Sequence, residues 1–300
     1  MNESVHRCGF VAILGAPNAG KSTLLNRLVG AKVSIVTHKV QTTRSQIRGI
    51  AVFGDTQIVF VDTPGIFAPK KRLERAMVDA AWAGAADADA LVVLVDGQRG
   101  LDANVRRIVE GVAASGRQAI LALNKIDAVK RPTLLALAQE LNATGAFTNT
   151  FMISAQNGDG VDDLRDALVA RMPAGPWLYP EDQLSDLPQR LLAAEITREK
   201  AYLRLHQELP YAIAVDTDSW EDFRDGSVRI NQTIYVERDS QKGIVLGKGG
   251  VTIRALRAEA QAELSDMLER PVHLFIHVKV RENWVNDPGR YREWGLKFDA

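Results

Sequence analysis

Two short strings of this 300-residue chain have the residue types and spacing needed to bind a guanine nucleotide. The first, Gly-Ala-Pro-Asn-Ala-Gly-Lys-Ser at 15–22, fits the pattern G-x-x-x-x-G-K-[ST] between an apolar run and a helical pattern. Its backbone N–H groups and the following helix N-terminus are expected to cradle phosphate. We expect Lys21 to reach the outer phosphates and Ser22 to bind Mg²⁺. The predicted nucleotide-binding residues here are Gly15, Ala16, Pro17, Asn18, Ala19, Gly20, Lys21, Ser22 and Thr23.

The second string, Asn124-Lys125-Ile126-Asp127, is expected to select guanine. An ionised Asp127 accepts two hydrogen bonds, which matches a donor pair on guanine that adenine lacks. The Lys125 stem is suited to cover the base, and Asn124 to tie this loop to the phosphate loop. A further triplet, Ser154-Ala155-Gln156, ends another apolar run and offers N–H groups to the guanine carbonyl.

A third string, Asp62-Thr63-Pro64-Gly65, follows the apolar run at 58–61 and is expected to respond to the terminal phosphate. We expect Asp62 to hold Mg²⁺ through water and the Gly65 N–H to contact the terminal phosphate. The polar stretch 33–45 contains Thr42 and Thr43. We predict that Thr43, with Thr42 as the alternative, completes the Mg²⁺ shell only when a third phosphate is present.

The residue after Gly65 is Ile66, which cannot orient water for hydrolysis as the glutamine of Ras-like GTPases does. We therefore predict slow intrinsic hydrolysis. Asn18 is either part of a site for a monovalent cation such as K⁺, or a residue that stabilises its loop by hydrogen bonding. The candidate catalytic residues are Lys21, Thr43, Gly65 and Asn18.

The first half of the chain alternates short apolar runs with helical patterns, which predicts a doubly wound α/β domain with parallel strands. Each of the strings above lies at the carboxyl end of a predicted strand, where such folds bind ligands. The predicted strands are 10–14, 58–62, 91–96, 119–124 and 150–154, and the predicted helices are 21–29, 76–86, 105–114, 133–142 and 161–171.

The stretch 172–180 contains three prolines and a glycine and interrupts this rhythm. We predict a GTP-binding domain at 1–173, a linker at 174–188 and a C-terminal domain at 189–300. In the latter the patterns predict helices at 189–209 and 251–268 and strands at 211–216, 228–238 and 272–280, which together form a small α+β unit.

Gly247-Lys248-Gly249-Gly250 fits the G-x-x-G loop by which KH domains clamp single-stranded RNA, although glycine runs also simply end helices. Residues 181–300 hold 17 basic and 21 acidic side chains, so RNA binding requires a focused basic site. The acid-free stretch 241–257 provides one, with Lys242, Lys248 and Arg254 as candidates. The last strand adds His273 and His277, which are individually more consistent with packed histidines than with RNA contacts.

Composition agrees with a soluble globular protein: 46% of residues are hydrophobic and 25% charged, with equal numbers of acidic and basic residues. The single cysteine, Cys8, permits no disulfide within the chain and is expected to be buried. We identify no signal peptide and no apolar run of membrane-spanning length, and expect a cytoplasmic protein.

The combined motifs resemble those of the Era family of bacterial ribosome-associated GTPases over nearly the whole chain. Besides the strings above, the resemblance rests on Gln41-Thr42-Thr43-Arg44, Ser154-Ala155, Tyr179-Pro180-Glu181-Asp182, Arg198-Glu199-Lys200, Glu208-Leu209-Pro210-Tyr211 and Pro271-Val272-His273-Leu274.

The resemblance implies a type II KH domain that binds the 3′ end of 16S rRNA, and GTP-controlled engagement of the 30S ribosomal subunit during its assembly. It also implies peripheral association with the inner membrane, and we expect a monomer. Two alternatives stay open: an RNA-binding chaperone that uses GTP only as a ligand, and a GTPase that acts on tRNA or membranes.

Overall fold

The computed structural model describes residues 6–39, 42–44, 46–205 and 209–300 and divides into two compact units. The first comprises Met1–Asp186 with Tyr291–Ala300, and the second comprises Leu187–Arg290. The sequence prediction places 291–300 in the C-terminal domain, whereas the structure groups these residues with the N-terminal unit. The domain bounds themselves stay a prediction.

The N-terminal unit contains a six-stranded sheet, within the residues described, in the order β2-β3-β1-β4-β5-β6. Its strands are β1 (Arg7–Gly15), β2 (Ile47–Phe53), β3 (Thr56–Asp62), β4 (Ala90–Asp96), β5 (Ala119–Asn124) and β6 (Phe147–Ile153). All neighbouring pairs are parallel except β2 with β3. The five strands predicted from the sequence are parallel, as expected. β2 is an additional strand that the sequence analysis does not predict, and the two residues between it and β3 permit only an antiparallel hairpin.

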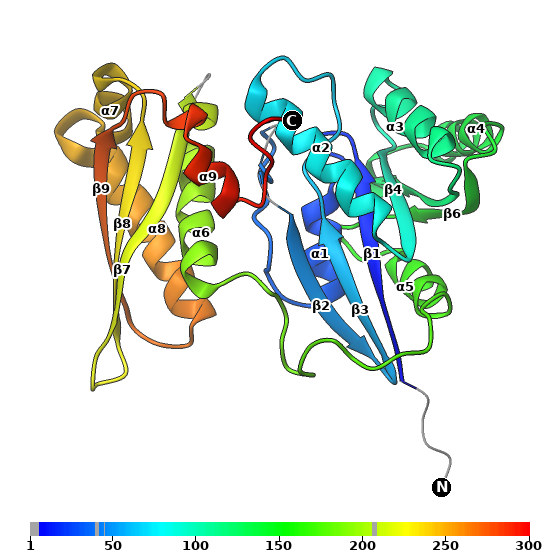
Figure 1. The fold of residues 1–300 in the computed structure, drawn as a ribbon, viewed down its shortest axis with the longest axis horizontal. Coiled ribbons are helices and arrows are strands. Elements are labelled where there is room, and N and C mark those ends of the chain that lie inside the picture. Colours follow the sequence, from blue (N-terminus) through cyan, green and yellow to red (C-terminus); the bar gives the residue numbers. More distant parts are fainter. Residues whose placement is uncertain (1–5, 40–41, 45, 206–208) are drawn as a thin grey trace, which may run out of the picture. The chain divides into compact units, whose positions relative to one another are not determined.

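Helices cover both faces of this sheet (Figure 1). Leucines of α1 and α5 pack on one face, and side chains of α2, α3 and α4 pack on the other. The helices are α1 (Lys21–Val29), α2 (Arg72–Ala86), α3 (Ala103–Ala114), α4 (Arg131–Asn142) and α5 (Val161–Val169), with a 3-10 turn, η1 (Ile126–Ala128), after β5. This is the doubly wound arrangement that the sequence predicts.

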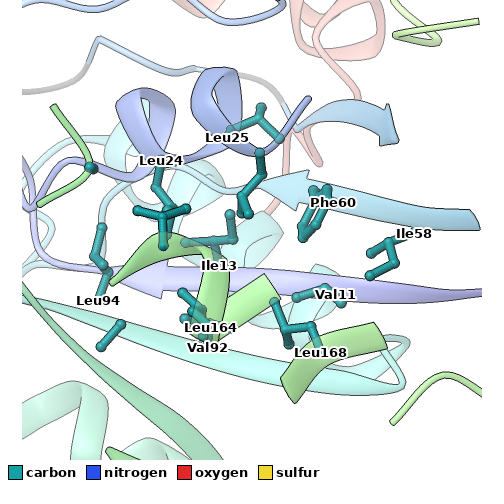
Figure 2. Packing of buried hydrophobic residues seen from close by; sticks show 14 of the residues in the cluster. Val11, Ile13, Leu24, Leu25, Ile58, Phe60, Val92, Leu94, Leu164 and Leu168 are labelled. Carbon is teal, nitrogen blue, oxygen red and sulfur yellow. The ribbon is translucent and has the colours of Figure 1, made fainter. Parts of the chain in front are cut away.

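Alternating residues of each central strand enter opposite halves of the core. In β1, Val11 and Ile13 face the cluster around α1 and α5, whereas Ala12 and Leu14 face the other cluster. Figure 2 shows Leu24 of α1 and Leu164 of α5 among these strand residues. Because both faces are buried, the strands are continuous apolar runs. The packed core fixes where each strand ends, and hence where the loops of the site begin.

The second unit has its helices on one side of a three-stranded sheet, ordered β7-β8-β9. Its elements in chain order are α6 (Gln189–Arg204), η2 (Leu209–Ala212), β7 (Ile213–Asp222), β8 (Val228–Val236), α7 (Asp239–Leu246), η3 (Lys248–Gly250), α8 (Val251–Met267), β9 (Val272–Val280) and η4 (Trp284–Asn286); α9 (Pro288–Glu293) follows. β7 and β8 are antiparallel, and β8 and β9 are parallel.

Several predicted bounds in this unit differ from the structure, including the end of β8, at Val236 rather than 238, and the end of α8, at Met267 rather than 268. The first helix ends at Arg204 rather than 209, and the first strand spans Ile213–Asp222 rather than 211–216. The 3-10 turn η2 occupies the region between them that the apolar patterns assign to helix and strand. Part of that region, 206–208, lies outside the described residues, as does Gln41.

No helix in the described part of the chain is both long enough and apolar enough to cross a membrane. The single cysteine, Cys8, is buried in β1, as the sequence predicts.

Candidate functional site

A cavity of about 600 Å³ lies at the carboxyl ends of β1, β3, β4 and β5. Eleven of the predicted nucleotide-site residues line it: Pro17, Asn18, Gly20, Lys21, Ser22, Thr23, Thr42, Thr43, Gly65, Lys125 and Gln156. Sequence reasoning did not single out Ile35, Val36, Thr37, His38, Asp96, Gln98 and Arg99, which also line it. The strings identified from the sequence therefore converge on one cavity.

The phosphate loop requires glycine at position 20 for two reasons. Gly20 has φ +101°, and a Cβ there would lie 2.3 Å from the Asn124 amide nitrogen. Beyond it the buried Lys21 ammonium donates hydrogen bonds to the carbonyls of Gly15 (3.0 Å) and Ala16 (3.1 Å). Burial lowers the pKa of Lys21 to about 8, and the charge of Asp62 partly offsets this effect.

Asp62 accepts hydrogen bonds from three hydroxyl groups through its Oδ2 atom. The donors are Ser22 (2.7 Å), Ser34 (2.9 Å) and Thr43 (3.3 Å), and the Ser22 and Thr43 hydroxyls are 3.1 Å apart. Burial raises the pKa of the Asp62 carboxyl, against the opposing effects of Lys21 and the three hydroxyls. Among the described residues, the buried Oδ1 atom of Asp62 has no hydrogen-bond partner.

The structure distinguishes the two adjacent threonines in the polar stretch. The Thr43 hydroxyl lies against Ser22 and Asp62. The Thr42 hydroxyl instead donates to the Lys39 carbonyl (2.7 Å) and lies 2.6 Å from the Thr37 hydroxyl. The geometry thus favours Thr43 over the alternative, Thr42, as a metal ligand.

Asn124 connects three loops of the site from a buried position. Its amide nitrogen donates to the Ala19 carbonyl (2.7 Å), and its amide oxygen accepts from the Ala155 N–H (2.9 Å). Arg27 of α1 adds hydrogen bonds to the carbonyls of Ala155 (3.3 Å) and Gln156. The phosphate loop, the loop after β5 and the loop after β6 are therefore held together by side chains.

The loop after β5 is also attached to the end of β4. Lys125 has φ +68°, and its ammonium forms an ion pair with Asp96 at 2.7 Å. Asp127 lies exposed in the 3-10 turn η1 and is not among the residues that line the cavity. Ser154 is buried, and its hydroxyl accepts from the Asn157 N–H (3.2 Å).

The residues at the end of β3 place backbone, rather than side chains, at the cavity. The Thr63 hydroxyl donates to the Ile13 carbonyl (2.8 Å), Pro64 follows it, and Ile66 is completely buried in the core. A Cβ on Gly65 would lie 3.0 Å from backbone atoms of Pro17. The Asn18 amide nitrogen donates to the His38 carbonyl at 2.7 Å.

In the second unit, the predicted loop Gly247–Gly250 lies between α7 and α8. Gly247 has φ +72°, and a Cβ there would lie 2.2 Å from the Thr252 hydroxyl oxygen. Lys248 and Arg254 are exposed, and Lys242 is half-buried. His273 and His277 are exposed on the uncovered face of the sheet, so neither is the packed histidine that the sequence favours.

Two family models match the chain, one in each unit. The model described as a 50S ribosome-binding GTPase matches residues 10–125, and the model described as a KH domain matches residues 208–285. The matched regions contain the phosphate-loop string and the loop Gly247–Gly250, respectively.

Curated relatives and solved structures match nearly the whole chain. GTPase Era of Agrobacterium fabrum is 63% identical over 97% of this chain and 92% of its own length, and that of Rhizobium meliloti is 62% identical over 97% and 93%. A crystal structure of Era in complex with MgGDPNP and nucleotides 1506–1542 of 16S ribosomal RNA has a TM-score of 0.92 and 36% identity, covering 97% of this chain and 99% of that one. A variant of Aquifex aeolicus Era bound to GDP and AlF4⁻ has a TM-score of 0.91 and 37% identity, covering 96% and 99%. The GTPase unit, with the cavity described above, and the KH unit thus occur in a chain that belongs to the Era family of GTPases.

Proposed function

We propose that this GTPase binds the 3′ end of 16S ribosomal RNA through its KH unit and acts as a GTP-controlled switch in 30S subunit assembly. The observation that carries the proposal is the loop Gly247–Gly250 with its exposed cations, in a chain similar in fold to an Era structure that contains nucleotides 1506–1542 of that RNA. GTP binding favours the RNA-bound form, and hydrolysis favours release.

The loop Gly247–Gly250 can contact both the backbone and the bases of an RNA strand. The Lys248 and Arg254 side chains are exposed and supply positive charge for phosphates, with Lys242 nearby in the chain. Ile244 and Val251 flank the loop and are 57% and 62% exposed. Exposed apolar side chains beside a phosphate-binding loop provide surface against which unstacked bases pack.

The hydroxyl and carboxylate cluster around Asp62 fits Mg²⁺. Mg²⁺ prefers oxygen ligands and is usually held by one or two carboxylates together with substrate phosphates. Ser22 and Thr43 would supply hydroxyl oxygens, and Asp62, with its partnerless Oδ1, would hold the ion through water. A bound Mg²⁺ would supply positive charge that neutralises the phosphates. Lys21 would exchange its carbonyl partners for phosphate oxygens, whose negative charge would offset the effect of the burial that lowers its pKa.

Guanine would be recognised by the loops after β5 and β6. Asp127 is exposed and accepts the two N–H donors of guanine, while the Lys125 stem covers the base plane. The loop Ser154–Gln156, held by Asn124 and Arg27, would offer the Gln156 N–H to the guanine carbonyl, because the Ser154 and Ala155 N–H groups donate to the Asp159 carbonyl and to Asn124.

Hydrolysis must proceed without a side chain after Gly65, because Ile66 is buried in the core. Gly65 therefore acts through its N–H, together with Lys21 and Thr43. Asn18 is proposed to help hold K⁺ beside the phosphates, a role compatible with its hydrogen bond to the His38 carbonyl of the switch loop. We also propose that the protein is a monomer, that it is located in the cytoplasm, and that it associates peripherally with the inner membrane.

The proposal is tested by the affinity of the full chain for a labelled oligonucleotide with the 3′-terminal sequence of 16S rRNA. With a non-hydrolysable GTP analogue we expect binding at least tenfold tighter than with GDP. Lys248→Glu should weaken binding by roughly tenfold, since one phosphate contact is lost. Lys279→Glu is the matched control, because Lys279 is exposed on the uncovered face of the sheet.

Three outcomes would contradict this function. One is equal competition by tRNA or a scrambled oligonucleotide, which would favour the tRNA alternative. Another is an equal effect of the two lysine variants. The third is an affinity that does not depend on which nucleotide is bound. For the potassium site, the hydrolysis rates of the unaltered chain and of Asn18→Ala are compared in K⁺ and Na⁺; identical rates in both ions would refute it.

A further inference from the structure

Arg99 brings a positive charge to the nucleotide cavity from outside the predicted motifs. Among the described residues, three lysine or arginine side chains line the cavity: Lys21, Arg99 and Lys125. Lys21 belongs to the phosphate loop, and Lys125 is paired with Asp96 at 2.7 Å. Arg99 donates a hydrogen bond through Nη1 to the Pro17 carbonyl (3.1 Å), and its nearest carboxylate, Asp102, is 3.8 Å away.

The backbone that carries Arg99 is fixed by the end of β4. The Arg99 and Gly100 N–H groups both donate to the Asp96 carbonyl, at 3.1 and 3.0 Å. The Asp96 carboxylate accepts from the Gln98 N–H (2.9 Å) as well as pairing with Lys125. Arg99 therefore extends from a turn that is fixed by hydrogen bonds, and its side chain is 48% exposed.

The neighbours of Arg99 lie at the terminal-phosphate end of the cavity. Its hydrogen-bond partner Pro17 lies against Gly65, whose N–H is the group expected to contact the terminal phosphate. A second hollow of about 270 Å³, on the side of the loop after Gly65, is lined by Pro17, Arg99 and Phe67. Arg99 thus lies between the phosphate loop and the segment that follows Gly65.

We propose that Arg99 is a further catalytic residue that stabilises the charge that develops on the terminal phosphoryl group during GTP hydrolysis. The inference rests on the proposed placement of GTP in this cavity. The water oxygen forms a bond to the γ-phosphorus as the bond to the β–γ bridging oxygen breaks, and that electron pair stays on GDP. The water protons leave to solvent and to the phosphate product, while Arg99 stays protonated throughout. An arginine in this position acts within the same chain, where other GTPases use one from a partner.

The hydrogen bond to Pro17 raises a competing explanation, in which Arg99 only holds the phosphate loop in shape. Arg99→Gln separates the two, since glutamine keeps an N–H donor for the Pro17 carbonyl but has no charge. Arg99→Lys keeps the charge without the planar fork. Arg106→Ala is the matched control, because Arg106 lies on α3 and pairs with the exposed Glu140, at 3.6 Å.

The test measures single-turnover GTP hydrolysis, GTP and GDP dissociation constants, and binding of AlF4⁻ to the GDP-loaded full chain. We expect Arg99→Ala and Arg99→Gln to hydrolyse GTP at least tenfold more slowly and to lose AlF4⁻ binding, with nucleotide affinities changed less than threefold. Arg99→Lys should be intermediate, and millimolar guanidinium should partly restore the rate of Arg99→Ala. Arg106→Ala should match the unaltered chain.

The inference is overturned if Arg99→Gln hydrolyses GTP at the unaltered rate, or if rate and affinity fall in proportion. It is also overturned if guanidinium restores nothing. Failure of the proposed GTP placement would be recognised separately, as an unchanged GDP affinity in Lys21→Ala.

Discussion

Replacing Asn124 by alanine should loosen the whole nucleotide site, because this one amide joins its loops. Asn124 is 2% exposed and makes two buried hydrogen bonds, to the Ala19 carbonyl and from the Ala155 N–H. Both partner residues are themselves buried. The variant removes both bonds and leaves two backbone groups without their partners.

The magnitude follows from those two groups. A buried polar group left unpaired costs about 1–3 kcal/mol. Water entering from the adjacent cavity can satisfy part of this loss, so we expect the free energy of unfolding of the N-terminal unit to fall by roughly 2–4 kcal/mol. Since the loops for phosphate and guanine lose their common tie, GDP affinity should fall at least tenfold, about 1.4 kcal/mol.

Two measurements are combined, both in the absence of nucleotide. Chemical denaturation gives the loss of stability, and hydrogen exchange assigns that loss to one unit of the two-unit chain. GDP affinity is measured on the same samples. Asn142→Ala is the matched control: Asn142 is exposed, and its amide oxygen accepts one hydrogen bond from the Thr150 hydroxyl (2.9 Å). We expect the control to change stability by less than about 0.5 kcal/mol. The reasoning fails if both variants unfold alike and bind GDP alike.

Three further changes probe separate parts of the chain. The pKa of Lys21 is lowered to about 8 and should rise again beside phosphate, so GDP binding should take up about half a proton at pH 8 and almost none at pH 6. Calorimetry in buffers of different ionisation enthalpy measures this proton uptake. Equal uptake at the two pH values would contradict the prediction. Thr43→Ala should weaken the affinity for a GTP analogue with Mg²⁺ at least tenfold more than the affinity for GDP, whereas Thr42→Ala should change the two affinities equally. If equilibrium binding shows the same change in the two variants, Thr43 is not the metal ligand. Gly247→Ala forces a side chain toward Thr252 at positive φ, so RNA affinity should fall at least tenfold with GTPase activity unchanged, and intact RNA binding would show that the loop is not the clamp.

Elements with strong patterns were predictable from the sequence, whereas edge elements were not. The strand β5 and the helix α1 have the predicted bounds, because a continuous apolar run and a glycine-lysine helix start are strong local signals. β2 was missed because it is an outer strand in which the exposed Arg48 and the following Gly49 interrupt the apolar sequence, so its buried run is short. Its pairing depends on a hairpin with β3, which local pattern does not reveal.

The same division holds for the candidate site. The residues in short motifs, such as Lys21 and Asp62, converge as predicted because strand ends meet at one edge of the sheet. Ser34, Asp96 and Arg27 were not predicted, since each acts through a partner far away in the sequence. Arg27, for example, contacts Ala155 across 128 positions of the chain. The spacing of residues along a single sequence does not indicate a contact between positions so far apart.

The burial of Ile66 determines where catalytic assistance can come from. A side chain that faces the core cannot orient water. At the position after Gly65 no side chain therefore assists hydrolysis, and the Gly65 N–H is the group that this turn offers to the terminal phosphate. Two polar side chains near Pro17 and Gly65 can contribute: Asn18, which donates to the His38 carbonyl, and Arg99, which extends from the turn after β4. The hydrolysis rate should therefore depend on how closely the loop that contains His38 packs against the phosphate loop. A partner or RNA that orders this loop would accelerate hydrolysis without supplying a catalytic group of its own.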